Sequence, residues 1–260
     1  MRYIYTTVTI IMLLSLSLSA KESYFDPYNP KPDKVIKKNA NPTKKINKTK
    51  KTTKNKKHKI HKKKSVKHIK VTQRLSKSLD KIYKKVLKKS SINRNALRRA
   101  FSFYKKNKIK KGLSSKYIAI ADYTKTANNK RLYIINLKNG AIYRHKIAHG
   151  KYSGSIGGRV KHSSNRRNSY MTPYGFFKIG TKIRRTRKKR YKYLPVKGLE
   201  WSNRKVGLPP RMGGRDIVLH PAKYVNYGGR SHGCFSICPQ DSRIIFAKLK
   251  KALLYSYTGR

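Results

Sequence analysis

The sequence has few acidic residues and few cysteines. Of its 260 residues, 8 are Asp or Glu and 68 are Lys or Arg, so the formal net charge is +60. A bias toward Lys, Asn and Ile does not account for the shortage of acids, so the imbalance indicates an anionic environment such as nucleic acid, lipid head groups or cell-wall polymer. The 2 cysteines are too few for a disulfide-rich scaffold, and a hydrophobic core must hold the chain together.

Long apolar runs are also missing. The longest, from about Val8 to Leu18, is shorter than the about 20 apolar residues that a bilayer span requires. A basic residue precedes this run and small residues end it, which is typical of a secretory signal peptide. We therefore expect residues 1–20 to be a cleaved signal peptide, with an uncleaved N-terminal anchor as the alternative. The mature protein would be secreted across the inner membrane and act in the periplasm or cell envelope.

Residues 21–72 are rich in Lys, Asn, Thr and Pro and have hardly an aromatic side chain after Tyr28. Like charges at this density repel, and the apolar surface is too small to offset the entropy of ordering, so we expect a disordered linker. Such a run attracts any polyanion without selecting one. We therefore expect an anionic envelope polymer as its partner and no specific nucleic acid; the alternative is a simple spacer.

Residues 73–112 have a helical pattern. Apolar side chains recur at three- and four-residue steps in 75–89 and 95–106 and predict two amphipathic helices, the second followed by a stop at Gly112. Because the apolar stripes are moderate, we expect this segment to pack on the domain that follows rather than to bind a membrane or nucleic acid.

Residues 113–260 have the pattern of β-strands. The predicted strands are 116–123, 131–137, 141–150, 174–180 and 216–220. Asn139-Gly140 predicts a tight primed turn between two of them, and the basic run 184–193 predicts a loop. A last helix, capped by Asp241, is expected to run into a final strand. The predicted fold is mostly β with a few helices.

Both cysteines lie in RSHGCFSIC, residues 230–238, and three chemistries compete for them. A zinc clip would combine Cys234 and Cys238 with His220 and His232, but its spacing matches none of the usual finger patterns. A disulfide requires the two Cα atoms to lie about 4.4–6.8 Å apart, which only some backbone conformations allow. The third hypothesis makes Cys234 a nucleophile whose thiol is activated by one of the histidines.

The residues around Cys234 fit the nucleophile hypothesis. Gly233 lets the backbone bend sharply, so that consecutive N–H groups can converge on an oxyanion. His220 ends an apolar run, so we expect it at the tip of a buried strand. A rigid base that faces a nucleophile on a glycine turn is the arrangement that acyl transfer requires.

Two blocks of sequence carry a family resemblance. SHGC, preceded by a histidine at the end of IVLH, resembles the signature of the YkuD-type L,D-transpeptidases, bacterial enzymes that remodel peptidoglycan. AHGKYSG followed by MTPYGFFKI is similar to the stretch that lies near the substrate in this family. Together with LEWSNR, these blocks resemble the murein L,D-transpeptidase catalytic domain branch over about residues 75–260. The resemblance implies a β-sandwich-like catalytic fold at 113–260, no metal or organic cofactor, and peptidoglycan stem peptides as substrates.

The resemblance also implies roles for individual positions. Cys234 matches the nucleophile and His220 the general base, and the N–H groups of Gly233 and Cys234, with His232, match the oxyanion hole. The positions that it implies for substrate binding are Ser231, Arg230, His149, Gly150, Thr172, Pro173 and Gly175.

Two positions depart from the family pattern. Pro221 stands where the family usually has Gly, but it keeps the carbonyl that orients the histidine. Ser236 stands where many members have Arg, which puts recognition of a substrate carboxylate in question, with Arg230 or Arg215 as substitutes. The interval from His220 to residue 231 is also shorter than usual, which implies a trimmed loop beside the site.

The implied reaction is attack of a cysteine thiolate on the third residue of a tetrapeptide stem, with loss of the terminal D-alanine. The acyl-enzyme then reacts with an amine to form a 3-3 crosslink, with water to leave a tripeptide, or with a protein lysine. One alternative is L,D-carboxypeptidase activity alone. The other is a secreted cationic protein that binds cell wall or nucleic acid and whose catalytic domain has degenerated. We expect a monomer.

Overall fold

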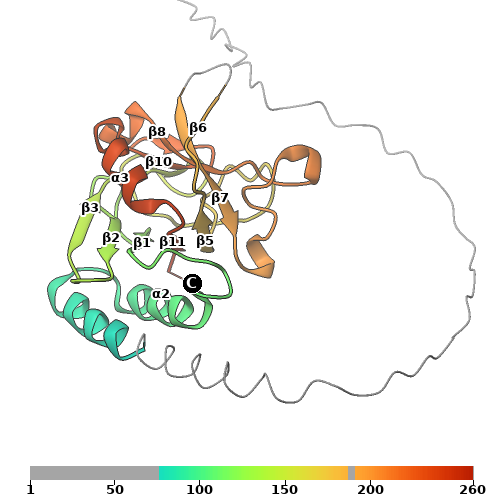
Figure 1. Ribbon diagram of the computed structural model, residues 1–260. Coiled ribbons are helices and arrows are strands. Elements are labelled where there is room, and N and C mark those ends of the chain that lie inside the picture. The colour runs from blue at the N-terminus through green and yellow to red at the C-terminus, as the bar shows by residue number, and fades with distance from the viewer. Residues whose placement is uncertain (1–75, 187–190, 260) are drawn as a thin grey trace, which may run out of the picture. The chain divides into compact units, whose positions relative to one another are not determined.

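The computed structural model describes residues 76–186 and 191–259 (Figure 1). The predicted signal peptide and the Lys-rich segment 21–72 lie outside these residues. Within the described ranges, no helix is both long and apolar enough to cross a membrane.

In the described residues, a first helical stretch at 76–89 is followed by eleven strands, four 3-10 helices and two α-helices. In chain order they are α2 (Arg94–Asn107), β1 (Tyr117–Asp122), β2 (Leu132–Asn136), β3 (Ile142–His145), β4 (His149–Gly150), β5 (Gly175–Ile179), β6 (Arg184–Arg185), β7 (Lys192–Gly198), η1 (Trp201–Asn203), η2 (Pro210–Met212), β8 (Val218–Pro221), η3 (Lys223–Tyr227), β9 (Arg230–Ser231), β10 (Phe235–Ile237), η4 (Pro239–Asp241), α3 (Ser242–Leu249) and β11 (Leu253–Tyr257).

Nine of these strands form one mixed sheet in the order β10-β8-β7-β5-β11-β1-β2-β3, with β6 paired to β7. The pairs β1–β11 and β10–β8 are parallel, and the other pairs of this sheet are antiparallel. β4 and β9 form a separate parallel pair. The mostly β class with a few helices is confirmed.

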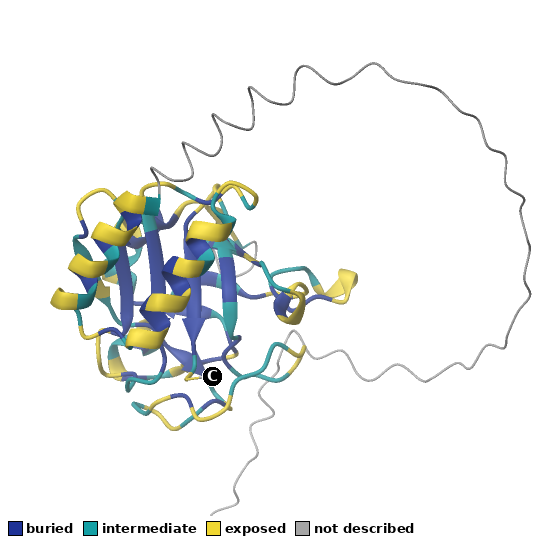
Figure 2. Ribbon diagram, turned by 90° about the horizontal axis from the view of Figure 1, so that it is seen from below, coloured by how far each residue is buried: buried dark blue, intermediate teal, exposed yellow. Residues whose placement is uncertain are grey.

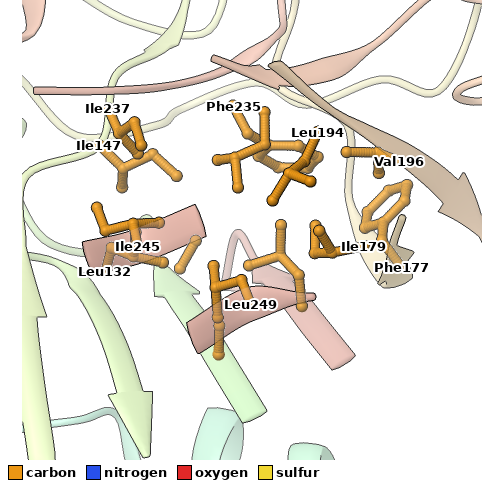
Figure 3. Packing of buried hydrophobic residues seen from close by; sticks show 14 of the residues in the cluster. Leu132, Ile147, Phe177, Ile179, Leu194, Val196, Phe235, Ile237, Ile245 and Leu249 are labelled. Carbon is orange, nitrogen blue, oxygen red and sulfur yellow. The ribbon is translucent and has the colours of Figure 1, made fainter. Parts of the chain in front are cut away.

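Each face of the sheet carries its own hydrophobic core. On β1, Ile118 and Ile120 pack with α2 and the first helical stretch, and Ala119 and Ala121 pack on the opposite side with α3. This is the period-two alternation that a strand covered on both faces requires. Figure 2 shows the helices with exposed outer faces over buried strands, and Figure 3 shows the core on the α3 side.

Both predicted amphipathic helices are confirmed, the first by the helical stretch at residues 76–89 and the second by α2. The Oδ1 atom of Asn93 accepts the backbone N–H groups of Asn95 (2.9 Å) and Ala96 (3.3 Å), which caps α2. The Asn93 N–H in turn donates to the Asp122 carboxylate at 3.0 Å. This bond ties the start of the helix to the end of β1.

Three predictions about a turn, a loop and a helix cap are wrong. The turn after β2 is not a two-residue primed turn: only Gly140 has a positive φ, of 74°, because Asn139 Oδ1 accepts the Ala141 N–H at 2.9 Å instead. The basic run 184–193 was predicted as a loop, but its described ends are strand residues of β6 and β7, which pair with each other. The sequence did not indicate these strand ends, because exposed residues at a sheet edge show no alternation of apolar and polar side chains. Asp241 makes no side-chain cap, because its carboxylate lies 3.1 Å from His145 Nδ1.

Candidate active site

The predicted base, His220, lies on β8 next to β10. Ser236 is its neighbour in the parallel register. The Nδ1 atom of His220 lies 3.0 Å from the Pro221 carbonyl oxygen. Since a carbonyl only accepts, Nδ1 carries a proton, and in the neutral form of the ring Nε2 is then the acceptor. Pro221 therefore fulfils the orienting role that its carbonyl was expected to keep.

A chain of hydroxyl groups ends at this imidazole. Ser236 Oγ lies 3.0 Å from His220 Nε2, and Tyr224 OH lies 2.7 Å from Ser236 Oγ. When the imidazole is neutral, Ser236 donates to Nε2 and accepts from the phenol. Burial raises the pKa of Tyr224 to about 12, so the phenol keeps its proton. The serine at the position where the resemblance predicts arginine therefore contacts the imidazole of the predicted base.

Tyr191 is a site residue that the sequence analysis missed. Its ring centroid lies 5.0 Å from that of His220, at an interplanar angle of 33°. The residue directly precedes β7, within the basic run that was predicted as a loop. The sequence spacing of that run did not identify Tyr191 as a site residue, because the pairing of β6 with β7 brings its ring to His220.

The predicted nucleophile, Cys234, directly precedes β10 and is half-buried. Its Sγ lies 4.0 Å from the backbone oxygen of Asp216, to which the thiol donates. Burial raises the pKa of Cys234, and the charge of Asp216 adds to this; a backbone hydrogen bond from Val218 and the charge of Arg215 act in the opposite direction. The resting thiol is therefore protonated at neutral pH.

The turn before the nucleophile depends on Gly233 and Ser231. Gly233 has a φ of 110°, and a Cβ at this position would lie 2.7 Å from the Met171 carbonyl oxygen. The sharp glycine bend predicted here is confirmed. Ser231 Oγ accepts the Gly233 N–H at 3.0 Å and donates to the Cys234 carbonyl oxygen at 2.8 Å. One of the two N–H groups that the resemblance assigns to the oxyanion hole, that of Gly233, is thus donated to Ser231 in this structure.

The β4–β9 pair joins His149 and Gly150 to the strand that leads into this turn, and it rests on a buried network. His149, opposite Arg230 in the pair, is fully buried, and its Nδ1 lies 2.9 Å from Nη2 of the equally buried Arg131. Burial, followed by the charge of Arg131, lowers the pKa of His149 to about 4. The neutral side chain of His149 therefore lies inside the protein, where it makes a structural hydrogen bond to Arg131, and its predicted contact with substrate stays a prediction.

Three other residues that were predicted to bind substrate, Thr172, Pro173 and Gly175, make contacts within the protein. Thr172 is buried, and its Oγ1 accepts the Gly150 N–H at 3.0 Å. Pro173 is buried and accepts a hydrogen bond from Ser256 at 2.5 Å. Gly175 has a φ of 99° beside Glu200. Thr172 and Pro173 are therefore buried residues with structural hydrogen bonds, and their predicted contacts with substrate stay predictions.

The two arginines proposed to replace the missing one differ in exposure. Arg215 is buried, which lowers its pKa to about 10, and it donates to the backbone oxygens of Ser164 and Met171. Arg230 is exposed, and its Nη1 donates to the backbone oxygens of Lys151 (3.0 Å) and Gly154 (3.3 Å). Both guanidinium groups therefore hold loops together around the nucleophile.

The geometry removes the disulfide and the shared zinc ion from the alternatives. Cys234 and Cys238 are free thiols, and β10 separates them. Four steps along an extended strand span about 13 Å, twice the Cα separation that a disulfide allows. One metal ion cannot bind both thiols across the same distance.

Comparison with known proteins then identifies the family. The model of the L,D-transpeptidase catalytic domain matches residues 88–257. The chain belongs to this family. The matched region contains α2, the buried pair Arg131 and His149, and the candidate site residues His220 and Cys234.

Two solved structures are similar to this L,D-transpeptidase domain. One is an L,D-transpeptidase from Mycobacterium smegmatis, with 15% identity, a TM-score of 0.32 and coverage of 55% of this chain and 58% of that one. The other is the L,D-transpeptidase (residues 123–326) from Xylanimonas cellulosilytica, with 14% identity, a TM-score of 0.30 and coverage of 55% and 61%. The similar region thus spans about three fifths of each solved chain. No curated protein matches the sequence.

Proposed function

We propose that this protein is a peptidoglycan acyltransferase that uses Cys234 as its nucleophile. The observation that supports the proposal most is the pairing of β8 with β10 inside a domain of the L,D-transpeptidase family. This pairing holds His220, oriented by the Pro221 carbonyl, beside the strand that begins directly after Cys234. The proposed substrate is the tetrapeptide stem, whose bond between the third residue and the terminal D-alanine is cleaved.

The raised pKa of Cys234 favours general-base attack over a preformed thiolate. In this mechanism, His220 Nε2 gives up the Ser236 hydroxyl and accepts the thiol proton as sulfur bonds to the substrate carbonyl carbon. The tetrahedral intermediate collapses, the C–N bond breaks, and the imidazolium donates its proton to the departing D-alanine amine. A thioester on Cys234 remains.

An amine or water then attacks this thioester, with His220 again as the base. An amine of a second stem yields a 3-3 crosslink, and water yields a tripeptide, so transpeptidase and carboxypeptidase activities share the acyl-enzyme. The cell envelope contains this substrate, and the apolar leader at 1–20 and the cationic segment 21–72 are consistent with secretion into it and with binding of an anionic polymer there.

The test is to incubate the purified, reduced protein with disaccharide-tetrapeptide and to identify the products by mass spectrometry. We expect crosslinked dimers, tripeptide or both from the wild type and from Cys238→Ala, and neither from Cys234→Ala. Dimers establish transfer to an amine, and tripeptide alone establishes a carboxypeptidase. Absence of turnover in the wild type contradicts the enzymatic proposal and favours the cationic binding protein.

A further inference from the structure

The site contains one more cation next to the nucleophile turn, Lys151. Its ammonium lies 4.5 Å from the ring centroid of Tyr170 and 5.1 Å from that of Tyr152, within the range of cation–π attraction. The two tyrosine rings meet edge to face, with centroids 5.7 Å apart. Tyr152 is 56% exposed, so the rings present the ammonium at the protein surface.

Lys151 differs from the two arginines of the site in what it contacts. The guanidinium groups of Arg215 and Arg230 donate to backbone carbonyls. In the described part of the chain, the two ion pairs are Lys105–Asp80 and His145–Asp241, so no carboxylate there pairs with Lys151. Aromatic rings hold its charge in position without neutralising it.

Two contacts connect this lysine to the nucleophile turn. The Lys151 N–H donates to the Ser231 carbonyl oxygen at 2.7 Å. The Tyr170 ring centroid lies 5.1 Å from that of His232, which is two residues from Cys234. The rings of Tyr152, Tyr170 and His232 therefore form a continuous strip that leads from Lys151 to the turn.

The backbone at Tyr170 supports a functional role for this strip. Tyr170 has a φ of 51° and Asn168 has a φ of 57°, a region that residues with a bulky side chain rarely adopt. Such strain persists where surrounding structure enforces it, and it concentrates at binding sites. In this conformation, Tyr170 contacts Tyr152, Lys151 and His232 at once.

We propose that Lys151, held between Tyr152 and Tyr170, binds a free carboxylate of the stem peptide and thereby places the scissile carbonyl at Cys234. The inference rests on the proposed function and names the chemistry of its substrate recognition. Two free carboxylates of the tetrapeptide stem flank the scissile bond, one on the side chain of the third residue and one on the C-terminal D-alanine, and the proposed partner of Lys151 is one of these two. Lysine supplies the cation that the Ser236 position does not.

The test measures binding to the full chain with Cys234→Ala, in which no turnover occurs, by calorimetry. The ligands are tetrapeptide, tetrapeptide amidated on the third side chain, and tetrapeptide amidated at its C-terminus. We expect Lys151→Met to weaken binding of the unmodified peptide about tenfold, the scale of one charge-assisted hydrogen bond. One of the two amidated peptides lacks the recognised carboxylate. We expect the parent chain to bind that amide about tenfold more weakly than the unmodified peptide, and we expect Lys151→Met to bind it as well as the parent does.

Two variants serve as controls. Lys151→Arg keeps the charge, and we expect it to retain the preference for the carboxylate over the amide. Lys116→Met removes one charge from an exposed position at the start of β1, and we expect parental affinity. Thermal unfolding of each variant reports whether it is folded.

The outcomes separate this inference from the proposed function. Equal affinity of parent and Lys151→Met for the unmodified peptide, or no binding by the parent, overturns the role of Lys151. The role of Lys151 is supported if Lys151→Met binds the unmodified peptide about tenfold more weakly and amidation of the peptide causes no further loss in that variant. This holds even if the wild type forms no product from the same peptide. If the wild type forms product but Lys151→Met has unchanged affinity, the enzymatic function is supported and the role of Lys151 is refuted.

Discussion

Arg131 is the buried residue whose replacement we expect to destabilise the protein most clearly. Its side chain has no exposed surface. Nε donates to the Ile147 carbonyl at 3.0 Å, Nη1 to those of Lys125 (2.8 Å) and Gly158 (3.4 Å), and Nη2 to His149 Nδ1 at 2.9 Å. The guanidinium thus joins three backbone segments to β4, the strand that supports the nucleophile turn.

Arg131→Met keeps most of the side-chain length and removes every donor. The most buried acceptors are the Ile147 oxygen and His149 Nδ1, and an unsatisfied buried acceptor costs about 1–3 kcal/mol. Removal of a buried charge offsets part of this loss, so we expect the free energy of unfolding to fall by about 2–4 kcal/mol. For a domain of this size, that lowers the Tm by about 4–16 °C.

Urea and thermal unfolding of the variant measure this effect. The matched control is Arg144→Met, because Arg144 is an exposed arginine on β3 and surface substitutions stay within about 0.5 kcal/mol of the wild type. A result for Arg131→Met within that same margin refutes the account of the buried network.

Three further predictions concern the site. Gly233→Ala should abolish turnover, whereas Gly259→Ala, with a φ of 90° but no contact closer than 3.5 Å, should not; equal activity of the two variants contradicts the clash with Met171. The contribution of His149 to the free energy of unfolding should be fully present above about pH 6.5 and should fall by on the order of 2 kcal/mol toward pH 4. The reason is that His149 in the unfolded chain binds a proton that the folded side chain, with its pKa of about 4, does not. A pH series of urea titrations should show a flatter slope for His149→Gln. Alkylation of Cys234 by iodoacetamide should be slow at pH 7 and accelerate in alkaline solution, because burial raises its pKa; rapid labelling below pH 7 argues against a protonated thiol.

The sequence was sufficient where patterns are local. Alternation at β1 and β2 and the helical spacing of α2 follow from which face each residue buries, so these elements could be predicted. The predicted strand 141–150 was wrong in its extent, because β3 and β4 divide it between two sheets. Gly233 was identifiable because only glycine adopts its φ without strain. The tight primed turn at Asn139-Gly140 was predicted wrongly, because the choice between two turn types depended on one side-chain hydrogen bond.

The sequence was insufficient where contacts are distant. Arg131 and His149 are 18 residues apart, and no spacing indicates that a guanidinium surrounded by backbone carbonyls fixes the imidazole. His149 was therefore assigned to the substrate, although it lies in the core. Tyr191 and Lys151 reach the site only through strand pairing, so their roles depend on the fold.

The most direct test of the central claim is to look for the acyl-enzyme itself. The reduced protein is mixed briefly with tetrapeptide stem, quenched in acid, and analysed by intact-protein mass spectrometry and peptide mapping. We predict an adduct equal to the stem acyl group without its D-alanine, attached to Cys234, present in Cys238→Ala and absent in Cys234→Ala. Product formation without any such adduct, or an adduct that persists in Cys234→Ala, would contradict the account.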